Sequence, residues 1–349
     1  MGSYAPSQMS SPSINVTEEE KPEPPMSTAD FKETLSTLPK VKDWTGLDYI
    51  YEYEGFWHHE YFLEGIISAQ QHYKPQPSDI VLSSVPKSGT TWLKALAFSI
   101  ATRHCYDDFT TTSLLLTKVP HKCVPRLEVD LVASPSHYDQ KNKREVPLVA
   151  THVPFTSLPK SLIDSDCKIV YICRDPKDAF VSMWHFFHNI FSPKGVEILP
   201  LEEAFEEFCK GLVFCGPYWD HVLGYWKASL ELPGRILFLK YEEMKRDTEG
   251  QVKILAEFMG FPFSAEEVKD GVVEKIIKMC SFECLSSLEV NKNGKNGEDT
   301  PFPVKNNVYF RKGDVGDWKN HLTSEMAKRL DSISDYKFSG SGLNLKSYG

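Results

Sequence analysis

The segment 80–92 constrains the fold more than any other part of the chain. Ile-Val-Leu-Ser-Ser-Val at 80–85 is typical of a buried strand, and an apolar helix is predicted at 92–103. The linking residues, Pro-Lys-Ser-Gly-Thr-Thr, place hydroxyl groups, a glycine and the charge of Lys87 at the helix N-terminus. Free backbone N–H groups and the helix dipole point to the same place. The sequence therefore predicts an α/β chain with an anion site at this strand–helix turn.

The same loop departs from the nucleotide-binding motif G-x-x-x-x-G-K-[ST]. Val81 and Pro86 stand where that motif requires glycine, and Lys87 precedes Gly89. This departure favours a P-loop relative that holds a phosphate group without being an ATPase or a kinase. An ordinary strand–turn–helix crossover with a hydroxyl-rich cap is the alternative that the loop alone leaves open.

Short apolar strands alternate with helices along the rest of the chain. We predict further strands at 146–151, 168–173 and 236–240, and helices at 27–38, 179–189, 201–211, 218–231 and 252–259. This alternation is typical of α/β proteins with a central, mostly parallel sheet flanked by helices. The polar segment 291–307 is expected to be a loop. Residues 1–27, rich in Ser, Pro and Glu, are predicted to be a disordered tail, and residues 28–349 a single domain.

Composition excludes several classes of protein. The chain has 349 residues and a formal net charge of −9, which argues against a nucleic-acid partner but allows a small basic pocket. It contains no apolar run of the roughly 18 residues that a membrane helix needs and no signal-peptide pattern, so we expect a cytoplasmic protein without a membrane partner. The eight cysteines are expected to be reduced, and Cys280 and Cys284 lack the second pair of a zinc site.

Three motifs, taken together, narrow the prediction: Pro-Lys-Ser-Gly-Thr-Thr-Trp at 86–92, Tyr-Ile-Cys-Arg-Asp-Pro-Lys-Asp at 171–178 and Arg-Lys-Gly-Asp-Val-Gly-Asp-Trp at 311–318. With them the chain resembles the cytosolic sulfotransferases, which transfer a sulfuryl group from 3′-phosphoadenosine 5′-phosphosulfate (PAPS) to a hydroxyl group. The resemblance runs from about residue 45 to the C-terminus. Stretches such as Cys-Gly-Pro-Tyr-Trp at 215–219 are similar to the plant flavonol sulfotransferases.

The resemblance implies a P-loop-like sulfotransferase fold and an acceptor that is a small hydroxylated plant metabolite, such as a flavonoid or another phenolic. A steroid, a hydroxyjasmonate or a desulfo-glucosinolate would undergo the same chemistry. It also implies that His152 is the general base for the acceptor hydroxyl and that Lys87 stabilises the leaving bridging oxygen. No metal is expected, because the donor already carries a good leaving group. A structural histidine is the alternative for His152; of the other histidines, His58 and His59 are the best rivals and are expected on the acceptor side.

The resemblance also implies the contacts of PAPS, the co-substrate. The 5′-phosphosulfate is expected at Lys87, Ser88, Gly89, Thr90 and Thr91, the 3′-phosphate at Arg174, Ser182, Arg311, Lys312 and Gly313, and the adenine at Trp92, Tyr241 and Phe282. Arginine suits phosphate because its planar fork matches the oxygens. Each assignment has a simpler alternative: a surface ion pair for Arg174, a solvated charge pair for Arg311–Lys312, and core packing for Trp92 and Tyr241.

The acceptor wall is expected to be aromatic. Phe186 lies one turn beyond Ser182 and matches an acceptor-pocket position of the family, and further wall candidates are Phe155, Phe56 and Trp57, all of which could instead be core residues. Animal relatives often carry lysine two positions before the catalytic histidine, where this chain has Ala150. We therefore expect Lys87 and His152 to account for more of the catalysis.

The dimerisation pattern of animal relatives is not recognisable between Asn291 and Tyr309, so a monomer or a weak homodimer is expected. Two other functions compete. A nucleotide kinase would need an acidic residue at a strand end to organise magnesium, where this chain has Arg174. A non-catalytic nucleotide-binding protein would tolerate the loss of His152 or Lys87, and both are present.

Overall fold

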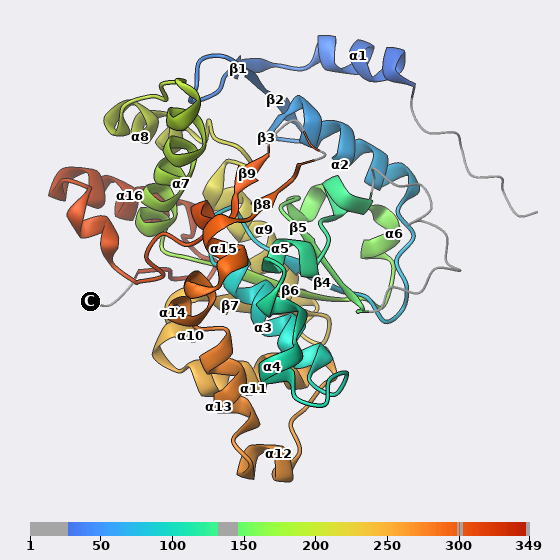
Figure 1. Ribbon diagram of the computed structural model, residues 1–349. Helices are drawn as coiled ribbons and strands as arrows, with labels where there is room; N and C mark the ends of the chain where they lie inside the picture. Colours follow the sequence, from blue (N-terminus) through green and yellow to red (C-terminus); the bar gives the residue numbers. More distant parts are fainter. Residues whose placement is uncertain (1–26, 132–145, 299, 301–302, 347–349) are drawn as a thin grey trace, which may run out of the picture.

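The computed structural model describes residues 27–131, 146–298, 300 and 303–346. All but one residue of the predicted disordered tail therefore lies outside the described residues. A parallel sheet with the strand order β5-β4-β6-β7 lies in the middle of the molecule, with helices on either side (Figure 1). Its strands are β4 (Ile80–Ser83), β5 (Leu148–Thr151), β6 (Lys168–Cys173) and β7 (Ile236–Lys240). The predicted α/β class with a central parallel sheet is confirmed.

Helices cover both faces of this sheet. Val81 of β4 packs in one apolar cluster with Phe180 of α7 (Pro176–Phe191), whereas Leu82 packs in another with Leu93 of α3 (Thr90–Thr102). Neighbouring residues of a strand point to opposite faces, so α7 and α3 lie on opposite sides. From β4 the strand order runs to β5 in one direction and through β6 to β7 in the other. The loops that follow β4 and β6 thus meet at a topological switch point, where open α/β sheets bind ligands.

The remaining elements surround the central sheet. An antiparallel sheet near the N-terminus contains β1 (Lys40–Lys42), β2 (Tyr49–Tyr53) and β3 (Phe56–His59), and a hairpin near the C-terminus contains β8 (Lys295–Asn296) and β9 (Val304–Lys305). The other α-helices of the described residues are α1 (Thr28–Thr37), α2 (Glu60–His72), α4 (Phe109–Thr112), α5 (Pro120–Cys123), α6 (Lys160–Ile163), α8 (Leu201–Lys210), α9 (Tyr218–Glu231), α10 (Tyr241–Arg246), α11 (Thr248–Met259), α12 (Ala265–Lys269), α13 (Val272–Met279), α14 (Phe282–Ser287), α15 (Glu289–Asn293) and α16 (Ser324–Lys337).

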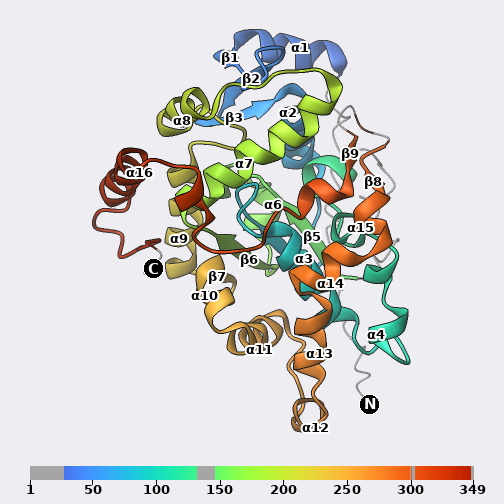
Figure 2. The same cartoon turned by 60° about the vertical axis from the view of Figure 1, so that its left-hand side comes forward.

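Some helices and strands differ in their bounds from the prediction, and the local sequence explains the difference. Helix α7 begins three residues before the predicted 179 because Asp175 caps it, accepting a hydrogen bond from Lys177 N, and Pro176 occupies the first turn. The prediction of a loop over 291–307 is wrong. That segment holds the end of α15 and the strands of the β8–β9 hairpin, which lies beside α15 in both ribbon views (Figures 1 and 2).

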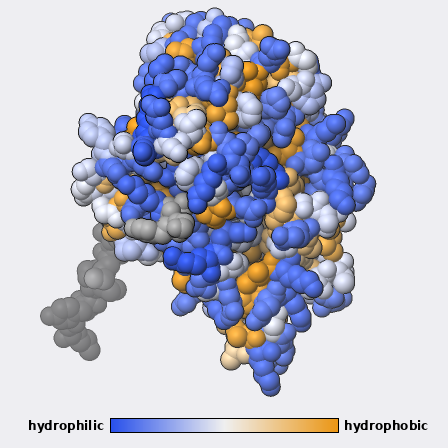
Figure 3. Space-filling view, turned by 90° about the vertical axis from the view of Figure 1, so that its left-hand side faces the viewer, coloured by the Kyte–Doolittle hydropathy of each residue, from blue (hydrophilic) through white to orange (hydrophobic). Residues whose placement is uncertain are grey.

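The surface is mixed in character. The face in Figure 3 is mainly hydrophilic, with apolar side chains in several separate groups. Helix α12 projects from the lower end of the molecule in both ribbon views (Figures 1 and 2). Among the described residues, no helix combines the length and the apolar character needed to cross a membrane.

Candidate active site

A cavity of about 870 Å³ opens where the loops after β4, β5 and β6 come together. Most of the predicted site residues line it: Lys87, Gly89, Thr90, Thr91, Trp92, His152, Arg174, Ser182, Phe186, Tyr241, Phe282, Arg311, Lys312 and Gly313. The fold therefore brings together motifs that are far apart in the sequence. Ser88, also predicted, is fully buried and is not among the described residues that line the cavity.

The loop after β4 has the tight geometry that its glycine predicts. Gly89 is the N-cap of α3 and has φ 108°, in the left-handed region. A Cβ at this position would lie 2.8 Å from Tyr241 Cδ2 and 3.1 Å from Ile172 Cδ1. Glycine is thus needed both for the backbone conformation and for the close approach of the loop to β6 and α10.

Lys87 contributes the positive charge of this loop. Its Nζ lies 4.2 Å from the centroid of the Phe186 ring, so the ammonium faces an aromatic wall of the cavity. Burial and the nearby charges of Arg174 and Arg311 lower the pKa of Lys87 to about 7. Three basic side chains so close together in one cavity indicate a site suited to an anion.

Unpaired donors support the same conclusion. Within the described part of the chain, Arg174 Nε and Arg311 Nε, on two residues that line the cavity, are buried without a hydrogen-bond partner. An unsatisfied buried donor costs on the order of 1–3 kcal/mol. A phosphate group offers several acceptor oxygens and would satisfy such donors, so these residues fit a phosphate group.

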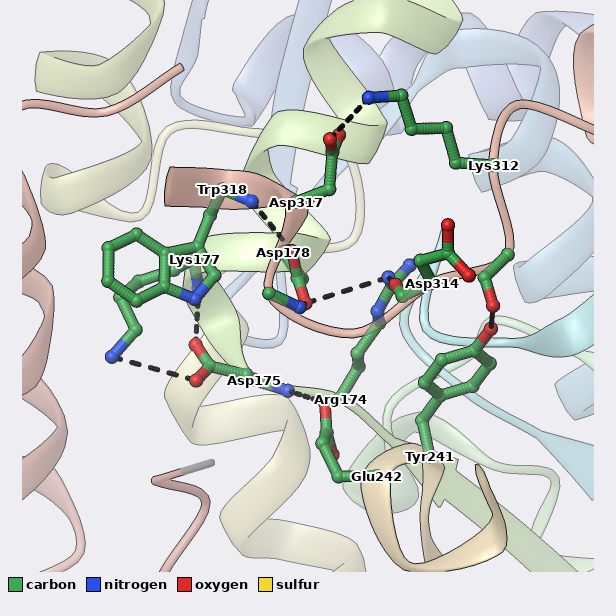
Figure 4. Close-up of polar contacts among 12 residues, drawn as sticks. Arg174, Asp175, Lys177, Asp178, Tyr241, Glu242, Lys312, Asp314, Asp317 and Trp318 are labelled. Atoms are coloured by element: carbon green, nitrogen blue, oxygen red, sulfur yellow. Dashed lines mark hydrogen bonds and ion pairs between the residues drawn. The ribbon is translucent and has the colours of Figure 1, made fainter. Parts of the chain in front are cut away.

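The carboxylate of Asp178 joins the start of α7 to the segment 313–318 (Figure 4). It is fully buried, accepts hydrogen bonds from Gly316 N at 2.7 Å and Trp318 N at 3.0 Å, and lies 3.7 Å from Arg174 Nη2. Arg174 Nη2 also donates to the carbonyl oxygen of Asp314 at 2.5 Å. These contacts fix the end of β6 against the third sequence motif.

Arg311 and Lys312 share one carboxylate, that of Asp317. Lys312 Nζ donates to Asp317 Oδ1 at 2.6 Å (Figure 4), and Arg311 pairs with the other carboxylate oxygen. Burial raises the pKa of Asp317, but hydrogen bonds from Lys312 and Arg311 outweigh it and hold that pKa below its usual range. The Arg311 side chain is 16% exposed and that of Lys312 is 47% exposed, so only Lys312 resembles a solvated charge.

Three aromatic rings form the neighbouring wall. The rings of Trp92 and Tyr241 lie 5.5 Å apart at 71°. A Cβ on Gly313 would lie 2.7 Å from Phe282 Cδ2, which shows how closely that ring packs on the backbone. Tyr241 Oη donates to the Gly313 carbonyl oxygen at 2.7 Å, and burial raises the pKa of Tyr241 to about 12. The rings are thus held beside the basic residues of the cavity.

His152 follows β5 and has a defined tautomer. Its Nδ1 lies 2.7 Å from the Ser84 carbonyl oxygen, which can only accept, so Nδ1 carries the hydrogen and Nε2 keeps its lone pair. Burial and the nearby charge of Arg126 hold the pKa of His152 well below its ordinary value. Glu128 Oε1 accepts a hydrogen bond from His152 N at 3.1 Å and fixes the turn. A neutral imidazole with an acceptor nitrogen is the form that a general base requires.

The sequence did not reveal a series of hydrogen-bonded polar side chains, Lys94, His121 and Thr91, that also lines the cavity. Lys94 Nζ donates to the Val124 carbonyl oxygen at 3.0 Å and lies 3.4 Å from His121 Nδ1. An ammonium has only donors, so His121 Nδ1 accepts and its Nε2–H donates to Thr91 Oγ1 at 3.0 Å. The Thr91 hydroxyl hydrogen is then available to another acceptor. The one sign of these hydrogen-bonded side chains in the sequence was a lysine within the apolar helix predicted at 92–103.

The aromatic part of the cavity differs from the predicted acceptor wall. Phe186 lines it, together with Phe62, Phe187, Phe214 and Tyr309. His59, which was expected on the acceptor side, lines it as well, whereas His58 is fully buried.

Phe155, Phe56 and Trp57 are not among the described residues that line the cavity. Phe155 packs against Tyr225 with 5.5 Å between ring centroids, and Phe56 is 7% exposed. Trp57 pairs with Glu52 in the antiparallel sheet. Of the four predicted wall residues, all within the described part of the chain, Phe186 alone lines the cavity.

Comparison with known proteins identifies the fold. A family model described as a sulfotransferase domain matches residues 77–342. The chain belongs to the sulfotransferase family. It is 52% identical over 297 residues to a flavonol 3-sulfotransferase of Flaveria bidentis, covering 85% of this chain and 93% of the relative. It is 49% identical over 313 residues to cytosolic sulfotransferase 16 of Arabidopsis thaliana, covering 90% and 91%.

Solved structures of other sulfotransferases have the same fold as this chain. The crystal structure of a putative steroid sulphotransferase of Arabidopsis thaliana matches with a TM-score of 0.70 and 36% identity, covering 92% of this chain and 98% of the other. A mouse sulfotransferase complexed with PAP (3′-phosphoadenosine 5′-phosphate) matches with a TM-score of 0.63 and 25% identity, covering 84% and 95%. This sulfotransferase is therefore an enzyme with the predicted fold.

Proposed function

We propose that the protein transfers a sulfuryl group from PAPS to a hydroxyl group of a small phenolic acceptor of the flavonoid kind, with His152 as general base. The observation that carries this proposal is one cavity that joins a neutral His152 to a cluster of cations at the ends of β4 and β6. A mouse relative of the same fold is complexed with PAP, which supports the choice of donor. Flavonol sulfotransferases among the relatives support the class of acceptor.

The residues divide into two phosphate sites and a base site. The loop after β4, with Lys87, Ser88, Gly89, Thr90 and Thr91, would hold the 5′-phosphosulfate. The 3′-phosphate would be held by Arg174, Ser182, Arg311, Lys312 and Gly313. The adenine ring would lie against the rings of Trp92, Tyr241 and Phe282. The unpaired nitrogens of Arg174 and Arg311 support this division, because phosphate oxygens would satisfy them.

The proposed chemistry needs a base and an electrophilic stabiliser. His152 Nε2 accepts the proton of the acceptor hydroxyl as its oxygen bonds to sulfur. The bond between sulfur and the bridging oxygen breaks, PAP leaves, and Lys87 stabilises the charge that develops on that oxygen. Burial and the nearby charges of Arg174 and Arg311 lower the pKa of Lys87, and the negative charge of the donor would oppose this effect. No step calls for a metal ion.

The acceptor half of the cavity is aromatic, which suits a flat phenol. Phe186 and Tyr309 lie 5.9 Å apart, and Phe62 and Phe214 lie 4.7 Å apart, between ring centroids. Steroids, hydroxyjasmonates and desulfo-glucosinolates are the alternative acceptors, and a steroid has support from the named activity of one structural relative. The names of the plant relatives support a cytosolic location.

The test is sulfuryl transfer from sulfur-35-labelled PAPS to a panel of flavonols, simple phenols, steroids, hydroxyjasmonates and desulfo-glucosinolates. We expect a labelled product with at least one phenol, and the same rate when EDTA is added. A protein that binds PAP in calorimetry yet labels none of these acceptors would instead be the non-catalytic nucleotide-binding protein.

A further inference from the structure

Arg126 is a cation of the active-site cavity that the proposed transfer of sulfuryl groups does not use. We propose that Arg126 binds an anionic group on the acceptor, so that the preferred acceptor is a phenol that also carries a carboxylate, sulfate or phosphate. This inference rests on the proposed function and adds to it the chemical class of the substrate. It concerns the acceptor half of the cavity, not the residues assigned to PAPS.

The backbone places Arg126 beside the proposed base. Arg126 forms an isolated parallel bridge with Ala150 of β5, and Ala150 N donates to the Pro125 carbonyl oxygen at 2.8 Å. His152 follows two residues after Ala150 on the same segment. Arg126 is thus an added rung at the edge of the central sheet, next to the strand end that carries His152.

The side chain of Arg126 faces the aromatic part of the cavity. Its Cζ lies 5.0 Å from the centroid of the Phe62 ring, and both residues line the cavity. A guanidinium stacked on an aromatic face keeps its N–H groups in the plane of the fork, where they can meet a carboxylate or a sulfate. An acceptor that reaches His152 therefore passes within reach of this cation.

The charge of Arg126 is only partly matched by the protein. Its Nε lies 3.8 Å from Glu128 Oε1, beyond hydrogen-bond distance, and the Glu128 oxygens accept from Thr151 Oγ1 at 2.8 Å and His152 N at 3.1 Å. Asp130 Oδ2 accepts from the backbone N–H of Arg126 at 2.6 Å.

Within the described residues, the terminal amino groups of the guanidinium make no hydrogen bond, and the side chain is 28% exposed. A guanidinium has five N–H donors in a planar fork. Because so few of them meet an acceptor of the protein, they are suited to bind an anion with two oxygens at once.

The neighbours of Arg126 also indicate that this anion belongs to the acceptor and not to the donor. The charges of Arg174 and Arg311 act on Lys87 of the proposed donor site, whereas the charge of Arg126 acts on His152 and its guanidinium lies over the Phe62 ring. A phenol of matching length would direct its hydroxyl to His152, lay its ring against the aromatic wall and present its anion to Arg126.

The test compares acceptors that differ only in the second substituent. We would measure kcat/KM for 4-methoxyphenol, 4-hydroxyphenylacetate, hydroquinone monosulfate and 4-hydroxyphenyl phosphate, with the wild-type enzyme and with Arg126→Met and Arg126→Lys. We expect at least one anionic phenol to exceed 4-methoxyphenol in the wild type, and Arg126→Met to reduce that preference by about 10- to 100-fold. Arg126→Lys should keep part of it. The anion that gains most identifies the substituent.

The control is Lys122→Met, which removes a cation of the same cavity that is half-exposed and lies 4.0 Å from Glu298. It should leave the preference unchanged. An equal preference in the wild type and Arg126→Met, or no preference in the wild type, would overturn the proposal. If no phenol is sulfated, the proposed function fails, and calorimetry of 4-hydroxyphenylacetate with the PAP complex still decides the role of Arg126: binding that Arg126→Met does not weaken refutes it.

Discussion

Lys87 makes nucleotide binding sensitive to pH in a way that calorimetry can resolve. Burial and the charges of Arg174 and Arg311 lower its pKa to about 7 in the unliganded protein. A bound nucleotide places phosphate charge beside the same ammonium, so in the complex the pKa should return toward the ordinary value of about 10.4. Binding then takes up a proton: about 0.5 proton at pH 7 and about 0.9 at pH 8.

The sign of the pH dependence follows from this uptake. The bound state has the higher pKa, so affinity for PAP is fully developed below about pH 7 and falls as the pH rises, by about tenfold per pH unit between about pH 8 and 10. The assay is titration calorimetry of PAP in two buffers with different ionisation enthalpies, such as HEPES and Tris. The difference in heat gives the number of protons taken up.

Lys87→Arg is the matched control, because arginine keeps the charge and does not lose a proton in this range. The 3′-phosphate itself titrates near neutral pH, but it does so equally in both proteins, so their difference isolates Lys87. We expect the proton uptake at pH 8 to vanish in Lys87→Arg. Equal uptake in the two proteins would refute the assignment of the depressed pKa to Lys87.

Two further predictions concern the donor side. Arg174→Ala should weaken PAP binding by about 1.5–3 kcal/mol, the scale of a hydrogen bond to a charged group, and unchanged affinity in calorimetry would contradict its phosphate role. Lys94→Met should slow transfer about tenfold, because His121 would no longer be held in the tautomer that orients the Thr91 hydroxyl. The same substitution should have no further effect in a Thr91→Val background, and an equal loss in both backgrounds would show that Lys94 acts elsewhere.

The sequence predicted the parts of the site whose chemistry is local. Lys87 and Arg174 follow strands directly, and the carboxyl ends of parallel strands meet at one edge of the sheet, so their proximity follows from the order of elements. The strands 168–173 and 236–240 were predicted with their final bounds, because continuous apolar runs between helices are a strong signal. Fold class and family needed no tertiary information.

The acceptor side could not be predicted in the same way. Aromatic content placed Phe155 and Trp57 in the wall, but it does not say which way a ring points, and the structure turns Phe155 toward Tyr225. Arg126 precedes a short π-helix, Leu127–Leu131, and lies outside any strand, so its bridge to Ala150 is visible only in three dimensions. The β8–β9 hairpin was missed because strands of two residues each carry no periodic signal.

The central claim is that His152 removes the proton from the acceptor hydroxyl. The variant His152→Asn is the sharpest test, because the asparagine amide can still donate to the Ser84 carbonyl oxygen but offers no basic nitrogen. His104→Asn, on a side chain that is 70% exposed, is the control.

The measurement is the rate of sulfuryl transfer from labelled PAPS to the best phenol of the panel, alongside the Kd of PAP. We predict a loss of about 10²- to 10⁴-fold in rate with an unchanged Kd for His152→Asn, and no loss for the control. A His152→Asn enzyme that retains the wild-type rate would contradict the account.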